Sequence, residues 1–139
     1  MVRFGKVAQT AIAAVSVLAE VYDEGLTKLN SADIAERRDL PQPTVAKVLT
    51  TLSAKGLVEG TRGPGGGYWL KRDPRTITLL DIVIEFERHD ASILCPFGPN
   101  WCGNGEPCPM HDNLVKLTEH WQDYLEKTKI SIFQTSDGK

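Results

Sequence analysis

The chain has 139 residues and a mass of 15.3 kDa, the size of one ordinary domain, which excludes a multidomain enzyme. Hydrophobic residues make up 41% and charged residues 24%, so the chain can bury a core and is neither disordered nor collagen-like. The net charge of -2 is the sum of +3 over residues 1–75 and -5 over residues 76–139, which favours an N-terminal surface that meets an anionic partner.

Two helices are predicted in the first 40 residues. Apolar residues at steps of three and four predict a helix over about 4–23. Asn30 is a typical N-cap, and Leu29 and Ile34 are spaced as the hydrophobic staple of a second helix. The segment Asp-Leu-Pro at 39–41 breaks that helix, so it is short.

A third helix and a β-hairpin follow. Gln42 begins the helix with a proline in its first turn, where proline is well tolerated, and Gly56 is its natural stop. Residues 57–59 and 68–70 are short strand candidates on either side of the glycine-rich loop 62–67. Strand, loop and strand predict a hairpin with a glycine tip.

The rest of the chain predicts two more helices and an irregular segment between them. Thr78 with Asp81 three residues later caps a helix. The apolar residues of that helix are Leu79, Ile82, Val83 and Phe86. Residues 91–109 hold four prolines, three glycines and every cysteine, so nothing regular is expected there. A last helix over roughly 111–129 carries an apolar face that needs a partner.

Three helices followed by a glycine-tipped hairpin are the organisation of a winged helix-turn-helix, a fold that binds duplex DNA. Gln42 and Thr44 are candidate base readers at the start of the third helix, and Lys47 is placed to meet phosphates. A tip with almost no side chains can enter a narrow minor groove while Arg62 supplies charge. The predicted DNA contacts are Gln42, Thr44, Lys47, Arg62, Gly63, Pro64, Gly65, Gly66 and Gly67.

A glycine run by itself is more often a flexible hairpin than a binding element. Here the run follows a helix-turn-helix pattern, and the combination favours DNA binding. The run lacks the Gly-Lys-Ser/Thr ending of a nucleotide-binding loop, and no paired carboxylates or nucleophile-base arrangement stands out. An enzyme is therefore not expected.

Cys95, Cys102, Cys108 and His111 have the spacing C-x6-C-x5-C-x2-H. Thiolates and imidazole suit iron–sulfur clusters and zinc alike. Structural zinc usually uses tight C-x2-4-C pairs, which are missing here, so the spacing lowers the case for zinc. An odd number of cysteines within 14 residues favours a reducing cytoplasm and a bound metal over an internal disulfide framework. A zinc site and a thiol switch stay open as alternatives.

The wing sequence at 62–68, the segment Ala-Asp-Ile-Ala-Glu-Arg at 32–37 and the three loop cysteines with His111 together resemble the IscR/NsrR-type family of winged-helix iron–sulfur transcriptional regulators. The similarity covers about residues 3–130. It implies a homodimeric bacterial transcription factor whose three cysteines hold an iron–sulfur cluster and whose long C-terminal helix forms the dimer interface. The candidate interface residues on that helix are Leu114, Leu117, Trp121 and Leu125.

The fourth ligand decides the cluster type that the resemblance implies. IscR-like members use a histidine, here His111, to complete a 2Fe-2S cluster. NsrR-like members use an acidic residue near the N-terminus of the other subunit for a 4Fe-4S cluster, and this chain has Ala8 and Gln9 there. A 2Fe-2S cluster is therefore favoured over 4Fe-4S, with Asp112 as a reserve ligand. The first gap between cysteines has six residues where relatives often have five.

The expected fold is mainly α with a small β-hairpin: a winged helix-turn-helix over residues 1–75, then a cluster-binding loop (91–110) and a dimerisation helix within 76–139. The expected partners are a double-stranded DNA operator and a second copy, with no membrane and no small-molecule substrate. The expected function is transcription regulation, as a cytoplasmic repressor that senses iron–sulfur status, redox state or nitric oxide. An electron-carrying iron–sulfur protein is the rival hypothesis, and it predicts no operator.

Overall fold

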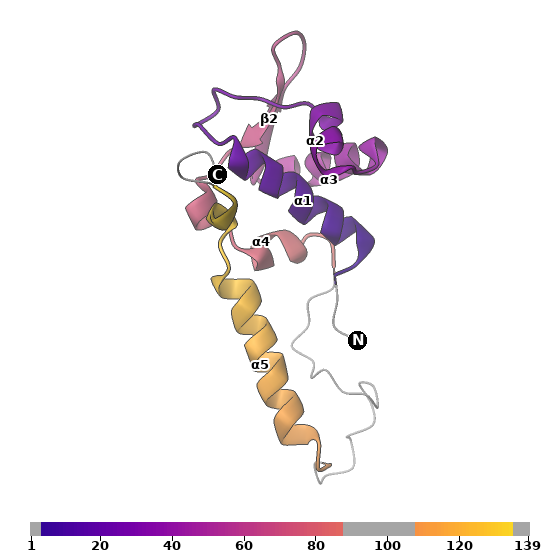
Figure 1. Cartoon of the computed structure of the whole chain (residues 1–139), viewed down its shortest axis with the longest axis vertical. Helices are drawn as coiled ribbons and strands as arrows, with labels where there is room; N and C mark the ends of the chain where they lie inside the picture. Colours follow the sequence, from indigo (N-terminus) through magenta and orange to yellow (C-terminus); the bar gives the residue numbers. More distant parts are fainter. Residues whose placement is uncertain (1–3, 88–107, 135–139) are drawn as a thin grey trace.

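The computed structural model of the chain describes residues 4–87 and 108–134. In chain order its elements are α1 (Lys6–Glu20), α2 (Ser31–Arg38), α3 (Gln42–Ala54), β1 (Val58–Thr61), β2 (Gly67–Leu70), the 3-10 turn η1 (Pro74–Thr76), α4 (Leu79–Val83), α5 (His111–Lys127) and the 3-10 turn η2 (Ile130–Phe133). The predicted fold class, mainly α with a small hairpin, is confirmed. Helix α5 projects from the body, and its N-terminal end and the hairpin tip point in opposite directions (Figure 1).

Helix α1 lies at the centre of the body and contacts α2, α3, α4, β2 and η2. Four of its buried residues are alanines, which let neighbouring elements approach closely. The helix is shorter than the predicted 4–23, because Gly5 is its N-cap and Val21 its C-cap. Phe4 and Tyr22 pack on the core from beyond the helix ends, so the apolar periodicity extends further than the helix.

Helix α2 begins at the predicted N-cap, Asn30. The Asn30 side chain accepts a hydrogen bond from the Asp33 backbone N–H at 2.8 Å, and the Asp33 carboxylate accepts one from the Asn30 N–H at 3.2 Å. This reciprocal pair satisfies two donors at the helix start. Leu29 and Ile34 are both buried, as the predicted staple requires. The helix ends at Asp39, which has a φ of 54°.

Helix α3 faces the core with Val45, Val48, Leu49 and Leu52, all of which are buried. It has a proline in its first turn, as predicted. Its predicted stop is also confirmed: Gly56 has a φ of 82°, and its N–H donates to the Ser53 carbonyl at 3.1 Å. The buried stripe fixes which face of α3 is left for solvent.

Strands β1 and β2 pair antiparallel from Val58↔Leu70 to Thr61↔Gly67, so the hairpin is longer than the predicted strands 57–59 and 68–70. The segment between α1 and α2 also forms backbone hydrogen bonds with β2 of this sheet. Leu29 N–H donates to the Tyr68 carbonyl at 3.1 Å, and Tyr68 N–H donates to the Leu29 carbonyl at 2.7 Å. The base of the wing is therefore fastened to the body close to the start of α2.

Helix α4 has the predicted cap. Asp81 N–H donates to Thr78 Oγ1 at 3.1 Å, and Thr78 N–H donates to Asp81 Oδ2 at 2.9 Å. The helix ends at Val83, so the prediction that Phe86 belongs to it is wrong. Phe86 lies on the following turn, where its N–H donates to the Val83 carbonyl at 3.0 Å, and it still packs on the core. The apolar periodicity of the sequence therefore identifies Phe86 as a core residue, although Phe86 lies outside the helix.

The 3-10 turn η1 before α4 has its own acidic cap. Asp73 accepts hydrogen bonds from the Arg75 backbone and guanidinium. The side-chain hydrogen bonds from Arg75 hold the pKa of the Asp73 carboxyl at about 2, below its ordinary value of 3.8. This carboxylate therefore stays ionised, and the cap stays formed, at more acid pH than for an ordinary aspartate.

The C-terminal end of α5 is tied into the body. Leu79 N–H donates to the Thr128 carbonyl at 3.0 Å, and Ile130 N–H donates to the Ile77 carbonyl at 2.8 Å. Leu125 and Ile130 belong to the same buried cluster as the apolar residues of α1, α2 and α3. One core therefore contains residues from both sides of position 75. The predicted division of the chain into a DNA-binding part (1–75) and a cluster-binding and dimerisation part (76–139) stays a prediction about function.

Gly67 is expected to tolerate replacement poorly for two reasons at once. Its φ is 143°, and a Cβ there would lie 2.9–3.0 Å from Leu29 backbone atoms. Gly67→Ala should lower the free energy of unfolding by about 2 kcal/mol or more, since both backbone strain and a clash with main chain must be relieved. Urea unfolding measures this change.

Gly63→Ala is the matched control, because Gly63 also has a positive φ, 89°, but a Cβ there meets nothing within 4 Å. It should cost only about 1 kcal/mol. Equal unfolding midpoints for the two variants would contradict the clash with Leu29.

Candidate functional site

The N-terminal ends of α2 and α3 are joined through two side chains. Gln42, the first residue of α3, donates from Nε2 to Oγ of Ser31, the first residue of α2, at 3.3 Å. Gln42 is exposed and Ser31 is half-buried. Thr44, the other predicted base reader, is half-buried in the first turn of α3. Sequence reasoning missed Ser31, although its position directly after a strong N-cap indicated where α2 begins.

Two of the predicted DNA contacts are positively charged side chains that are exposed to solvent. Lys47 is exposed on the solvent face of α3, and Arg62 is exposed where the hairpin strands end. Within residues 4–87 and 108–134, neither side chain makes a hydrogen bond or an ion pair. Their positive charges are therefore not neutralised by the described part of the chain.

The hairpin tip is built from glycines that divide into two groups. Gly63, Pro64 and Gly65 are exposed, and a Cβ on Gly63 or Gly65 would meet nothing within 4 Å. A Cβ on Gly66 would lie 2.5 Å from the Thr61 carbonyl oxygen, and Gly67 is buried. The missing side chain of Gly67 lets the hairpin pack against Leu29, and its predicted contact with DNA stays a prediction.

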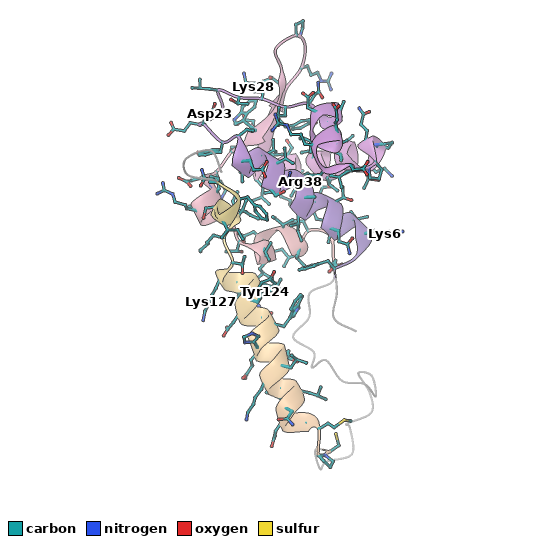
Figure 2. The ribbon with its side chains drawn as sticks, viewed as in Figure 1. Lys6, Asp23, Lys28, Arg38, Tyr124 and Lys127 are labelled. Atoms are coloured by element: carbon teal, nitrogen blue, oxygen red, sulfur yellow. The ribbon has the colours of Figure 1, made fainter. Side chains whose placement is uncertain are left out.

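Trp69 and Lys28 support the base of the wing. The Lys28 ammonium lies 5.2 Å from the centroid of the Trp69 ring, within the range of a cation–π contact. A Cβ on Gly25 would lie 3.1 Å from Trp69 Nε1, so the α1–α2 turn fits closely over the indole. Figure 2 shows Lys28 on this turn beside the hairpin. Sequence reasoning did not single out Lys28, because its partner is 41 residues away.

Two of the four predicted metal ligands lie in one turn at the start of α5. His111 N–H donates to the Cys108 carbonyl at 3.0 Å, and the half-buried Cys108 is a free thiol. Cys95, Cys102 and most of the loop 91–110 lie outside the described residues. Within the described ranges, no group of three or more His, Cys, Asp or Glu side chains is placed to hold a metal ion. The donor set of three thiols and one imidazole suits an iron–sulfur cluster by its chemistry.

The four predicted interface residues of α5 differ in their surroundings. Leu117 is 50% exposed, whereas Leu125 is 1% exposed and lies in the chain's own core. Trp121 is half-buried against Phe4, with ring centroids 5.4 Å apart, and Leu114 is half-buried. Leu125 therefore has almost no exposed surface left to offer a second chain. The exposed Leu117 and the half-buried Leu114 and Trp121 keep surface that a second chain can contact.

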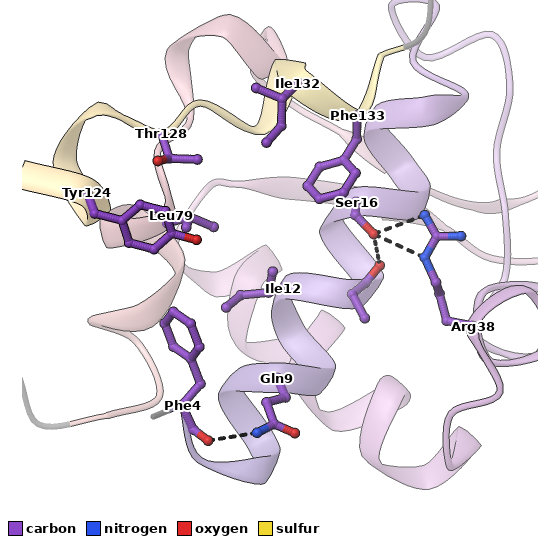
Figure 3. Close-up of a pocket in the computed structure, with 11 residues that line it drawn as sticks. Phe4, Gln9, Ile12, Ser16, Arg38, Leu79, Tyr124, Thr128, Ile132 and Phe133 are labelled. Atoms are coloured by element: carbon purple, nitrogen blue, oxygen red, sulfur yellow. Dashed lines mark hydrogen bonds between the residues drawn. The ribbon is translucent and has the colours of Figure 1, made fainter. Parts of the chain in front are cut away.

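A cavity of about 290 Å³ lies beside the base of α5, between α1, α4 and η2. Its walls are mostly apolar: Phe4, Ile12, Leu79, Tyr124, Ile132 and Phe133. Figure 3 shows Arg38 and Ser16 on one side of it and Phe4 and Tyr124 on the other. Arg38 donates to the Glu20 carboxylate at 2.6 Å, so its charge is already paired.

Known proteins resemble this chain in family, in sequence and in structure. The family model Rrf2, described as an iron-dependent transcriptional regulator, matches residues 5–134. An Aquifex aeolicus protein named as an HTH-type transcriptional regulator is 32% identical over 91% of this chain and 88% of its own length. The HTH-type transcriptional regulator IscR of Xenorhabdus nematophila is 31% identical over 87% of this chain and 70% of its own length.

Among solved structures, CymR of B. subtilis, described as its global cysteine regulator, superimposes with a TM-score of 0.80. That match covers 97% of this chain and all of CymR at 20% sequence identity, so it bears on the fold. In the part of the chain that the structure describes, no helix is both long and apolar enough to cross a bilayer.

Replacing Lys47 or Arg62 by alanine is expected to weaken binding to duplex DNA and to reduce the slope of log affinity against log salt concentration by about 1 for each phosphate that is no longer neutralised. Fluorescence anisotropy over a salt series measures both quantities. Lys116→Ala is the control, because Lys116 is exposed on α5 and pairs with no acid in the described residues. An unchanged slope for all three variants would exclude phosphate contacts by Lys47 and Arg62.

Proposed function

Because the chain belongs to the Rrf2 family of iron-dependent transcriptional regulators, we propose that it binds a duplex DNA operator as a homodimer and senses its signal through an iron–sulfur cluster. It is a transcriptional regulator and not an enzyme. The observation that carries the DNA-binding geometry is the solvent face of α3 together with an exposed glycine tip, with two cations, Lys47 and Arg62, that have no partner among the described residues. These elements lie away from the N-terminal end of α5 (Figure 1).

The proposed DNA contacts divide by chemistry. Gln42 and Thr44 are the base readers, since amide and hydroxyl groups can hydrogen-bond to base edges in the major groove. Lys47 meets phosphate. Arg62 and the exposed tip at Gly63–Gly65 enter the minor groove, where a narrow groove has an enhanced negative potential. Gly66 and Gly67 shape the tip from within the hairpin.

Cys95, Cys102, Cys108 and His111 are the proposed ligands of the cluster. The cluster would supply a centre that reacts with oxidants or nitric oxide, and relatives named IscR support its presence. Cys108 and His111 lie in one turn, so one short stretch of backbone presents a thiol and an imidazole together. His111 is the one non-thiolate ligand of this set. A histidine ligand favours 2Fe-2S over 4Fe-4S.

The proposed homodimer covers the exposed apolar side chains near α5. Leu117, Tyr124 and Ile132 are 45–65% exposed, and the cavity beside the base of α5 is lined by Tyr124 and Ile132. An apolar surface of this kind on a regulator fits a second copy, because a dimer matches the two-fold symmetry of a two-half-site operator. We place the regulator in the cytoplasm, where its three thiols stay reduced.

We propose that the two parts of the chain have different functions. Residues 1–75 read DNA, and residues 76–139 hold the cluster and the partner. Because the two parts share one core, a change at the ligand turn reaches the reading helices through packed elements. The regulator is proposed as a repressor whose operator affinity differs between the cluster-loaded and cluster-free states.

Anaerobically purified protein is expected to absorb visible light and to contain iron and acid-labile sulfide. Cys108→Ser should lose most of this absorbance, while His111→Cys should keep a cluster with a shifted spectrum, because a thiolate can replace the imidazole. His120→Ala is the control, since His120 is exposed on α5 away from the ligand turn. A colourless, zinc-loaded wild-type sample would exclude the cluster.

Leu117→Asp is expected to convert the dimer to a monomer, since it places a charge in the centre of the proposed apolar interface. Sedimentation velocity measures the mass. Glu119→Ala is a control on the same helix, where the exposed Glu119 makes no ion pair with the described residues. A Leu117→Asp protein that stays dimeric would place the interface elsewhere.

A further inference from the structure

The contact between Gln42 and Ser31 is not part of the cap of α2. Helix α2 is capped by Asn30 and Asp33, which satisfy each other's backbone donors without Ser31. Among the described residues, the Ser31 hydroxyl has one hydrogen-bond partner, the Gln42 amide. Alanine at position 31 would keep the cap and suit a first helical turn, so the stability of the fold does not depend on this serine.

The same contact bears on where the Gln42 amide points. Gln42 is exposed, and an exposed glutamine samples many side-chain rotamers. The hydrogen bond of 3.3 Å from Nε2 to Ser31 Oγ selects conformations that hold the amide against the start of α2. A side chain that is already ordered loses less conformational entropy when it binds.

The amide keeps what it needs to read a base. A glutamine side chain has two N–H donors and one oxygen acceptor with two lone pairs. Ser31 occupies one N–H, which leaves the other N–H and Oε1 for an adenine edge, where N7 accepts and N6–H donates. Fixing one N–H therefore fixes the direction in which the remaining donor and acceptor face.

We propose that Ser31 is a positioning residue that holds the Gln42 amide on the start of α2 and thereby sets the base preference at the operator position that Gln42 reads. This inference rests on the proposed function. It assigns Ser31 no contact with a base: the serine acts through Gln42. Loss of the serine should reduce discrimination at that one base pair and leave the phosphate contacts of Lys47 and Arg62 unchanged.

The experiment uses the full-length protein, purified anaerobically. A random duplex pool is enriched with the wild-type protein, and the enriched duplex is then changed one base pair at a time. Gln42→Ala identifies the position that Gln42 reads, because discrimination disappears there. Ser31→Ala should lose about three- to tenfold of the discrimination at that same position, the cost of ordering one side chain. The double variant should be no worse than Gln42→Ala alone.

Two variants complete the test. Ser31→Thr keeps the hydroxyl and should restore the base preference. Ser53→Ala removes an exposed hydroxyl at the other end of α3 and should leave the preference intact. Salt dependence and thermal midpoint should match the wild type for each serine variant, which separates positioning from folding and from phosphate binding.

The possible failures are distinguishable. If Ser31→Ala keeps wild-type discrimination at the position that Gln42→Ala identifies, Ser31 does not position Gln42 and the proposed function stands. If Gln42→Ala loses discrimination nowhere, the positioning role is overturned because Gln42 reads no base. If no duplex is enriched from the pool, sequence-selective DNA binding itself is wrong.

Discussion

The burial of α1 on several sides is the constraint on which the rest of this structure depends. Its alanines let α2, α3 and the hairpin pack against one part of its surface while α4 and η2 pack against another. A larger side chain at Ala11 or Ala14, both fully buried, would separate these neighbours, because a close-packed interior has little space to absorb added volume. Helix α3, the proposed DNA-reading helix, and the base of α5 are therefore held against a common support.

Much of this fold could be predicted because each helix end is determined by residues close to it in the sequence. Asn30, Thr78 and Gly56 act within a few residues of the ends they define, so sequence alone placed them correctly. The errors arise where distant packing decides. Phe86 has the spacing of a helical residue but lies on a turn, and the pattern at 4–23 includes core side chains beyond both ends of α1. Periodicity reports which side chains face the core, whether or not their backbone is helical.

The candidate site was predictable in its residue types and less so in its arrangement. Exposed cations and an open glycine tip were found as expected, because these residues have no competing partner in the described chain. The burial of Gly67 and Leu125 and the support from Ser31 and Lys28 depend on contacts between segments distant in sequence. Such contacts have no signature at short range, so they could not be found from a single sequence.

Helix α5 contains 17 residues and is therefore about 25 Å long. Its far end carries Cys108 and His111, and its near end is fastened by backbone hydrogen bonds at Leu79 and Ile130. A continuous helix is stiff along its axis, so α5 moves as a rigid rod that is attached at the edge of the core. A sideways displacement of the turn at Cys108 and His111 would therefore rotate α5 about its attachment, where Thr78 pairs with Lys129.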